Sequence, residues 1–97
     1  MDFGNLMAQA KSYLNFTWED SAKEKRIEGY LYSSMAYLND VAGYELDFEE
    51  NTLANDLLMN RVLYMDSQAL PDFNANYSGL LQELQIHGKC QENNDTV

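Results

Sequence analysis

The sequence predicts an all-α protein, a small bundle of about four helices with short loops and a flexible C-terminal tail. Apolar residues recur at spacings of three and four along most of the chain, which is the pattern of amphipathic helices. Val and Ile are few, and no long segment alternates between apolar and polar residues as a strand would. At 97 residues the chain has room for one core. We expect a helical domain at residues 1–86 and a polar, disordered tail at residues 87–97.

The first two helices are predicted over residues 3–14 and 18–42. The first carries one apolar stripe, made of Phe3, Leu6, Met7, Ala10 and Leu14. Thr17 and Asp20 fit a capping box at the start of the second helix, in which each side chain accepts a hydrogen bond from a free backbone N–H. Gly43 is expected to end this helix, because it adopts the left-handed conformation without a Cβ clash.

The second predicted helix has a wide apolar surface. One stripe consists of Ile27, Leu31, Met35, Leu38 and Ala42, and its neighbour consists of Tyr30, Tyr37, Val41 and Tyr44. Together the stripes cover roughly 180° of the helix, against ~100° for a helix that packs on one side only. We therefore predict that the first stripe faces the core and that the second forms the contact between adjacent subunits, since an exposed apolar arc usually marks an interface.

A short acidic loop is predicted between the second and third helices, at residues 44–51. Its acidic residues are Glu45, Asp47, Glu49 and Glu50. An EF-hand calcium loop needs Gly at its sixth position and Glu at its twelfth, and counting from Asp47 these positions hold Thr52 and Leu58. We expect no metal site in this loop.

The last two helices are predicted over residues 52–69 and 72–86. Arg61 lies between two apolar arcs of the third helix, far along the sequence from any other basic residue. A cation at a partly buried position needs a partner, so we expect a structural ion pair with a carboxylate. Pro71 fits the first turn of the fourth helix.

The charge balance argues against several classes of partner. The chain has 16 acidic and 6 basic residues, a formal net charge of -10. Such a field repels nucleic-acid phosphates and anionic lipids, so we expect protein partners and no membrane binding. No apolar run is longer than Val62–Met65, which predicts neither a membrane span nor a secretion signal. The same acidity would also serve solubility alone.

The sequence shows no arrangement for catalysis. The only His and the only Cys, His87 and Cys90, lie in the predicted tail, where nothing rigid would hold them in a reactive geometry. Phosphate-binding glycine loops, HExxH and CxxC are absent from the sequence. We expect no enzymatic activity and no cofactor. An aromatic content of 12% favours an assembly interface instead, because Tyr and Trp suit surfaces that are apolar on one side and wet on the other.

Several segments occur in the order found in a known family. They are the turn NFTWED at residues 15–20, the run MAYLNDVAG at 35–43, LDFE at 46–49, and ALPDF at 69–73, which leads into an aromatic and leucine-rich last helix. In these features the chain resembles the head-tail connector proteins, or head-completion adaptors, of siphophages and their prophages. The resemblance runs from about Leu6 to Leu84 and consists of helix and turn positions.

The resemblance implies a structural virion protein, made in the host cytoplasm and located at the head-tail connector. Such a subunit forms a homo-oligomeric ring beneath the portal protein, a dodecamer where it follows the portal's twelvefold symmetry. The ring extends the channel, through which phage DNA passes without sequence-specific binding, and it docks a stopper or tail-completion protein. The acidic loop is our first choice for the channel lining, because a lumen that binds phosphate would retard the DNA.

The alternative is a small acidic, phage-encoded DNA mimic that inhibits a host DNA-binding protein. A mimic needs carboxylates spread over one face at phosphate-like spacing, whereas residues 28–72 mix acidic residues with apolar stripes that need partners. Electron microscopy of the purified protein separates the two, since the connector predicts rings with a central pore and the mimic predicts monomers or dimers.

Overall fold

The part of the chain that the structure describes forms five helices and no strand, which confirms the all-α prediction. The structure is a computed structural model that describes residues 3–15 and 20–95, with the backbone alone over residues 87–95. The helices are α1 (Phe3–Tyr13), α2 (Ser21–Ala42), α3 (Thr52–Asp66), α4 (Leu70–Asn76) and α5 (Ser78–Asp95). The fourth predicted helix is divided at Tyr77 into α4 and α5, which accounts for the additional helix.

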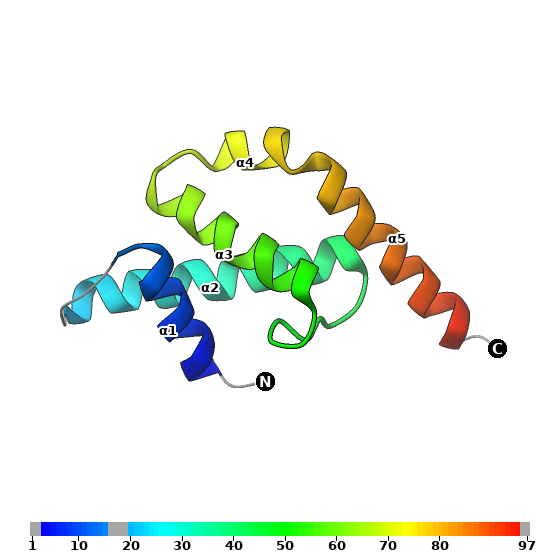
Figure 1. The fold of residues 1–97 in the computed structure, drawn as a ribbon, viewed down its shortest axis with the longest axis horizontal. Helices are drawn as coiled ribbons and strands as arrows, with labels where there is room; N and C mark the ends of the chain where they lie inside the picture. Colours follow the sequence, from blue (N-terminus) through cyan, green and yellow to red (C-terminus); the bar gives the residue numbers. More distant parts are fainter. Residues whose placement is uncertain (1–2, 16–19, 96–97) are drawn as a thin grey trace.

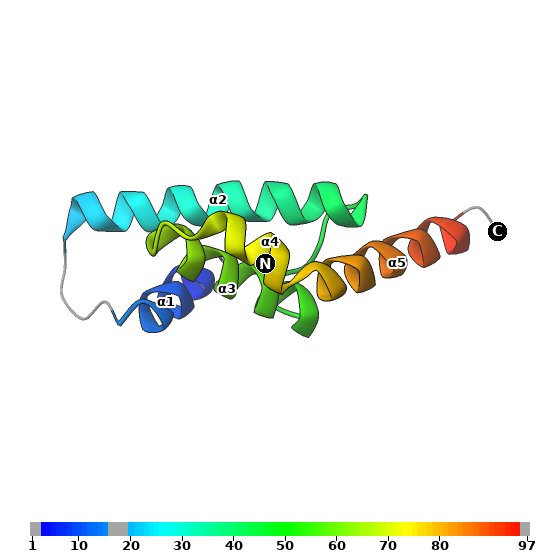
Figure 2. The same cartoon turned by 90° about the horizontal axis from the view of Figure 1, so that it is seen from above.

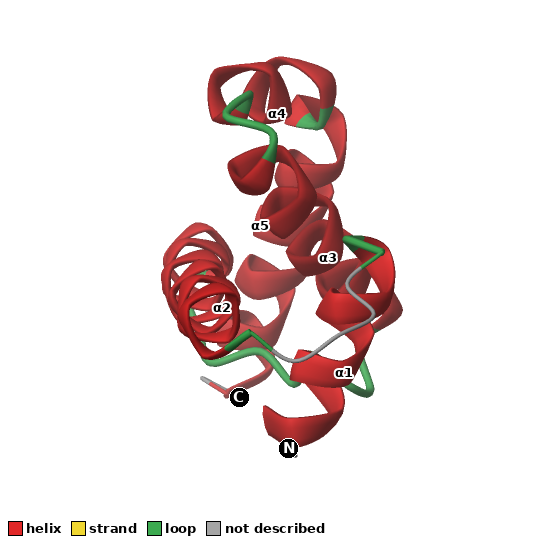
Figure 3. Ribbon diagram, turned by 90° about the vertical axis from the view of Figure 1, so that its left-hand side faces the viewer, coloured by secondary structure: helices red, strands yellow, loops and turns green. Residues whose placement is uncertain are grey.

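α2 is the longest element; it crosses the middle of the view in Figure 1 and lies along one side of the molecule in Figure 2. α3 packs beside it, and α1 contacts both α2 and α3. α4 contacts α3, and α5 returns to contact the C-terminal half of α2. Seen end-on in Figure 3, α2 lies to one side of α1, α3 and α4. The last turns of α5 extend past the end of α2 (Figure 2), so the molecule is elongated, with extents of 49 × 29 × 17 Å.

The core is one cluster of apolar side chains to which every helix contributes. The first stripe of α2 is buried, as predicted. Phe48 from the loop before α3, Phe73 from α4 and Leu84 from α5 are also fully buried. Each such side chain stabilises the fold by roughly 1.5 to 3 kcal/mol relative to an exposed position. The core therefore holds all five helices of the described chain in one unit.

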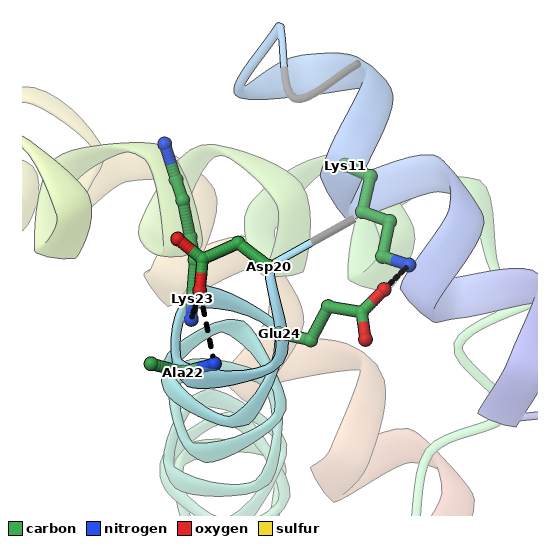
Figure 4. A network of polar contacts seen from close by, with 5 residues as sticks. All are labelled: Lys11, Asp20, Ala22, Lys23 and Glu24. Carbon is green, nitrogen blue, oxygen red and sulfur yellow. Dashed lines mark hydrogen bonds and ion pairs between the residues drawn. The ribbon is translucent and has the colours of Figure 1, made fainter. Parts of the chain in front are cut away.

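The start of α2 is capped by Asp20, whose Oδ1 accepts hydrogen bonds from the backbone N–H groups of Ala22 and Lys23 (Figure 4). The predicted capping box placed Asp20 inside the helix, and this is wrong, because the helix begins one residue later, at Ser21. A carboxylate is at least as good an N-cap as a threonine hydroxyl, so Asp20 fills that position itself. Thr17, the other member of the predicted box, lies outside the described residues.

An ion pair joins the end of α1 to the start of α2. Lys11, in the last turn of α1, pairs with Glu24, in the first turn of α2 (Figure 4). Each charge lies at the helix end whose dipole it complements. Both side chains are about one-third exposed, so the pair orients the two helices and contributes at most about 1 kcal/mol to stability.

The other end of α2 is closed by Gly43, as predicted. Its φ angle is 84°, and its backbone N–H donates to the carbonyl oxygen of Asn39. α3 begins with Asn51 as the N-cap, whose side chain accepts a hydrogen bond from the Ala54 N–H. The loop between α2 and α3 is therefore fixed at both ends by helix caps.

α3 ends at Asp66, earlier than the predicted residue 69. Gln68 adopts a left-handed conformation with φ 58°, and the Ala69 N–H donates to the Tyr64 carbonyl oxygen. This is the hydrogen bonding of a Schellman motif with Gln in the place usually taken by Gly. Pro71 lies in the first turn of α4, as predicted, although the helix already begins at Leu70.

Three aromatic rings hold α4 against α3. Tyr64 contacts Phe73 and Tyr77 edge to face, with both centroid distances 5.8 Å. Phe73 and Tyr77 stack at 4.9 Å, and the Asn76 side chain donates a hydrogen bond to the Tyr64 hydroxyl. Because α4 is too short to be stable alone, this cluster fixes its position.

The backbone of α5 is helical to Asp95, past residue 86, where the last helix was predicted to end. The structure describes no side chain from residue 87 on. The flexible polar tail over residues 87–97 therefore stays a prediction.

Two glycines of α2 should respond to alanine in opposite directions. At Gly29, within the helix, an added Cβ meets nothing within 4 Å, so Gly29→Ala should stabilise the fold by about 0.5 to 1 kcal/mol. At Gly43 the positive φ penalises any Cβ, so Gly43→Ala should destabilise it by about 1 kcal/mol. Urea unfolding of the two variants beside the wild type measures both. Equal shifts of the same sign would contradict the assignment of Gly43 as a left-handed cap.

Candidate functional site

The acidic loop forms an exposed corner between α2 and α3. Its four carboxylate residues, Glu45, Asp47, Glu49 and Glu50, are all exposed. Leu46 lies between Glu45 and Asp47 in the sequence, and Phe48 lies between Asp47 and Glu49. Both apolar side chains are buried in the core. The two buried side chains anchor the segment in the core, while the carboxylates beside them remain at the surface. We call residues 45–50 the acidic corner.

Hydrogen bonds hold the acidic corner in one conformation. The Asn39 side-chain oxygen accepts from the Leu46 N–H at 2.8 Å. Asp47 Oδ1 accepts from the N–H groups of Glu49 and Glu50 at 3.1 and 3.2 Å. The Asn55 side-chain amide donates to the Phe48 carbonyl oxygen at 3.0 Å. The corner is thus attached to both α2 and α3.

A pair of amide side chains connects the corner to α1. The amide nitrogen of Gln9 donates to the Asn55 oxygen at 2.8 Å, and the Asn55 amide donates back to the Gln9 oxygen at 2.9 Å. Since Asn55 also binds the Phe48 carbonyl, α1, α3 and the corner share one partly buried hydrogen-bond network. This network holds the backbone of the corner against α1 and α3.

An open hollow of about 520 Å³ lies beside the acidic corner, against α2. Its lining residues are Tyr32, Met35, Ala36, Asn39, Glu45, Leu46, Asp47 and Phe48. Met35, Leu46 and Phe48 form an apolar floor, while Glu45 and Asp47 are exposed at the rim. The arrangement suits a group that has an apolar stem and a positive end.

The sequence analysis missed Tyr32, which is 55% exposed and lines this hollow. Its ring stacks on that of Phe3 from α1, with centroids 4.7 Å apart and planes 10° from parallel. The signal was present in the sequence, since Tyr32 is a large aromatic residue that lies in neither apolar stripe of α2.

Arg61 is buried, with 8% of its surface exposed, but the predicted ion pair is wrong for the part of the chain described here. Its Nη1 donates to the Ser34 hydroxyl at 3.1 Å, and its guanidinium lies over the Tyr37 ring, 4.3 Å from the centroid. Its Nε has no hydrogen-bond partner. Burial lowers the pKa of Arg61 below its usual value. A hydroxyl and a ring face therefore take the place of the expected carboxylate.

The second stripe of α2 is not an exposed arc, which removes the reason for assigning it to a subunit interface. Its members, Tyr30, Tyr37, Val41 and Tyr44, are partly buried and pack against the core. Tyr37 lies against Arg61 of α3, and its hydroxyl donates to the Asn74 side chain of α4 at 3.4 Å. The wide apolar surface of α2 is needed within the chain, because α1, α3 and α5 all contact this helix.

Among the described residues, no group of three or more His, Cys, Asp or Glu side chains is placed to hold a metal ion. No helix in the described part of the chain is long and apolar enough to cross a lipid bilayer. No family model, no curated protein and no solved structure shows a significant match to this chain.

Tyr37→Ala should destabilise the monomer by about 2 kcal/mol, because it removes a half-buried ring and the only π-face over Arg61 in the described chain. Tyr37→Phe keeps the ring and should stay within about 0.5 kcal/mol of the wild type. Thermal unfolding at low protein concentration measures both. An unchanged melting temperature for Tyr37→Ala would restore the interface assignment.

Stability should fall at high pH through Tyr30 and Tyr77. Burial, with Asp66 nearby, raises the pKa of Tyr30, and burial, with Tyr64 nearby, raises the pKa of Tyr77. A tyrosine whose pKa is raised on folding contributes stability below its ordinary pKa of 10.0, and this is lost as the pH rises further. Urea unfolding at about pH 8 and about pH 11 should show the loss. A Tyr30→Phe, Tyr77→Phe double variant should lose less stability between these two pH values than the wild type does.

Proposed function

We propose that this chain is a structural subunit of a phage head-tail connector, which forms a ring beneath the portal and docks a stopper or tail-completion protein. One observation carries the proposal. The segments 35–43 and 46–49, in which the sequence resembles the connector family, meet in space and build the acidic corner and its hollow. Two of the four resembling segments therefore lie together at one defined surface.

The build of the acidic corner suits a part of a DNA channel. Its carboxylates are exposed, and the backbone that carries them is held by Asn39, Asp47 and Asn55. An acidic surface repels the DNA phosphates, and a rigid backbone keeps its carboxylates in place as the DNA passes. In the proposed ring Glu49 and Glu50 of this corner face the lumen or the edge next to it.

The distribution of charge favours the connector over the DNA mimic. A mimic presents carboxylates over one continuous face, whereas here an acidic corner lies at one end of α2 and the exposed cations Lys25 and Arg26 lie near the other. Unlike charges at opposite ends favour contact between copies of the chain.

The experiment is negative-stain electron microscopy of the full chain with and without the portal protein of the same phage. We expect monomers or weak oligomers of the free protein at low concentration, since a domain of this size offers limited contact area. Rings with a central pore are expected on the portal. If the chain stays monomeric with the portal at every concentration and binds a host DNA-binding protein instead, the connector proposal is wrong. The DNA mimic would then be the better hypothesis.

A further inference from the structure

The basic residues of the described chain are concentrated at one end of α2. Apart from the buried Arg61, and from Lys89 of α5, whose side chain the structure does not describe, they are Lys11, Lys23, Lys25 and Arg26. The acidic corner follows the other end of the same helix. A helix of 22 residues is about 33 Å long, so the two regions cannot meet within one copy. Asp20, Glu24 and Glu28 lie in the same region, but Asp20 caps the helix and Glu24 pairs with Lys11. The exposed cations Lys25 and Arg26 therefore lie at a fixed separation from the acidic corner.

The hollow beside the acidic corner has the chemistry to accept a basic side chain. Its floor of Met35, Leu46 and Phe48 is buried and apolar, which suits the methylene stem of Lys or Arg. Glu45 and Asp47 at the rim suit the charged end. Tyr32 offers an aromatic ring at the same opening, which favours a cation further.

We propose that this hollow binds Lys25 and Arg26 of a second copy of the chain. This rests on the proposed function, because it supplies the contact between neighbours in the ring. Each copy then presents two different surfaces, the basic end of α2 and the acidic hollow. A contact between unlike surfaces repeats from copy to copy and closes into a ring where the rotation permits.

The net charge of -10 limits how two copies of the chain can meet. Two such chains repel one another on average, because acidic residues outnumber basic ones by 16 to 6. The basic end of α2 against the acidic hollow is the orientation that places cations against carboxylates. Like-charge contacts elsewhere would exclude other arrangements.

Charge reversal tests the contact in the full-length chain. Lys25→Glu and Glu45→Lys each place like charges across it, and both residues are exposed, so the variants should fold. Each alone should weaken self-association by about tenfold or more. An equimolar mixture of the two should associate to within about threefold of the wild type, because the reversed charges again match. Sedimentation velocity over a concentration series gives the constants.

Glu83→Lys is the matched control, since it changes the net charge as Glu45→Lys does but lies on α5, away from the lining of the hollow. It should associate like the wild type. If it weakens association as much as Glu45→Lys, or if the mixture is no better than the single variants, the contact is wrong. Rings that form on the portal with Lys25→Glu as well as with the wild type would overturn the contact and leave the connector proposal standing. A mixture whose restored association stops at dimers would uphold the contact and overturn the ring.

Discussion

The packing of α2 against three other helices is the constraint on which the rest of this structure depends. A chain of 97 residues buries only about two-thirds of the surface that its unfolded form exposes, so each apolar stripe has to be used. α2 contacts α1, α3 and α5, and its fully buried Ile27, Leu31 and Leu38 lie in the shared core. α1 and α4 are too short to be stable alone. They are stabilised by packing against the pair formed by α2 and α3.

The seam between α2 and α3 also contains the one buried cation among the described residues. A buried charge usually needs a carboxylate, because its desolvation is expensive. Arg61 has instead the Ser34 hydroxyl and the Tyr37 ring, which stabilise the guanidinium without burying a second charge. The strongly acidic chain around it adds a long-range field that favours a positive group. Acidity and the buried arginine are therefore compatible, and Tyr37 is needed inside the subunit because it covers that cation.

The sequence predicted most of the fold because its signals are local. Apolar spacing gave the helices of residues 3–14 and 18–42 to within a few residues, and Gly43 marked the end of α2 because glycine adopts the left-handed conformation without a Cβ penalty. The end of α3 was missed because Gln68 adopts the left-handed position without the glycine that usually marks it. The acidic corner was predicted as a loop, but its hollow was not, since it forms only where residues 32–39 meet residues 45–48. The partners of Arg61 and Tyr37 depend on the register of α2 against α3, which periodicity does not specify.

The acidic corner shows how a few buried residues decide what a strongly charged surface can do. Leu46 and Phe48 anchor the corner in the core, and Asn39 and Asn55 tie the corner to the two main helices. The position of the corner relative to the basic end of α2 is therefore as rigid as the core itself. When unlike surfaces are held at a fixed angle, repeated contact generates a fixed rotation from one copy to the next. If the proposed ring forms, its number of subunits would then follow from the geometry of α2 and the corner. Substitutions that tilt α2 in the core would change the closure of such a ring without touching either surface.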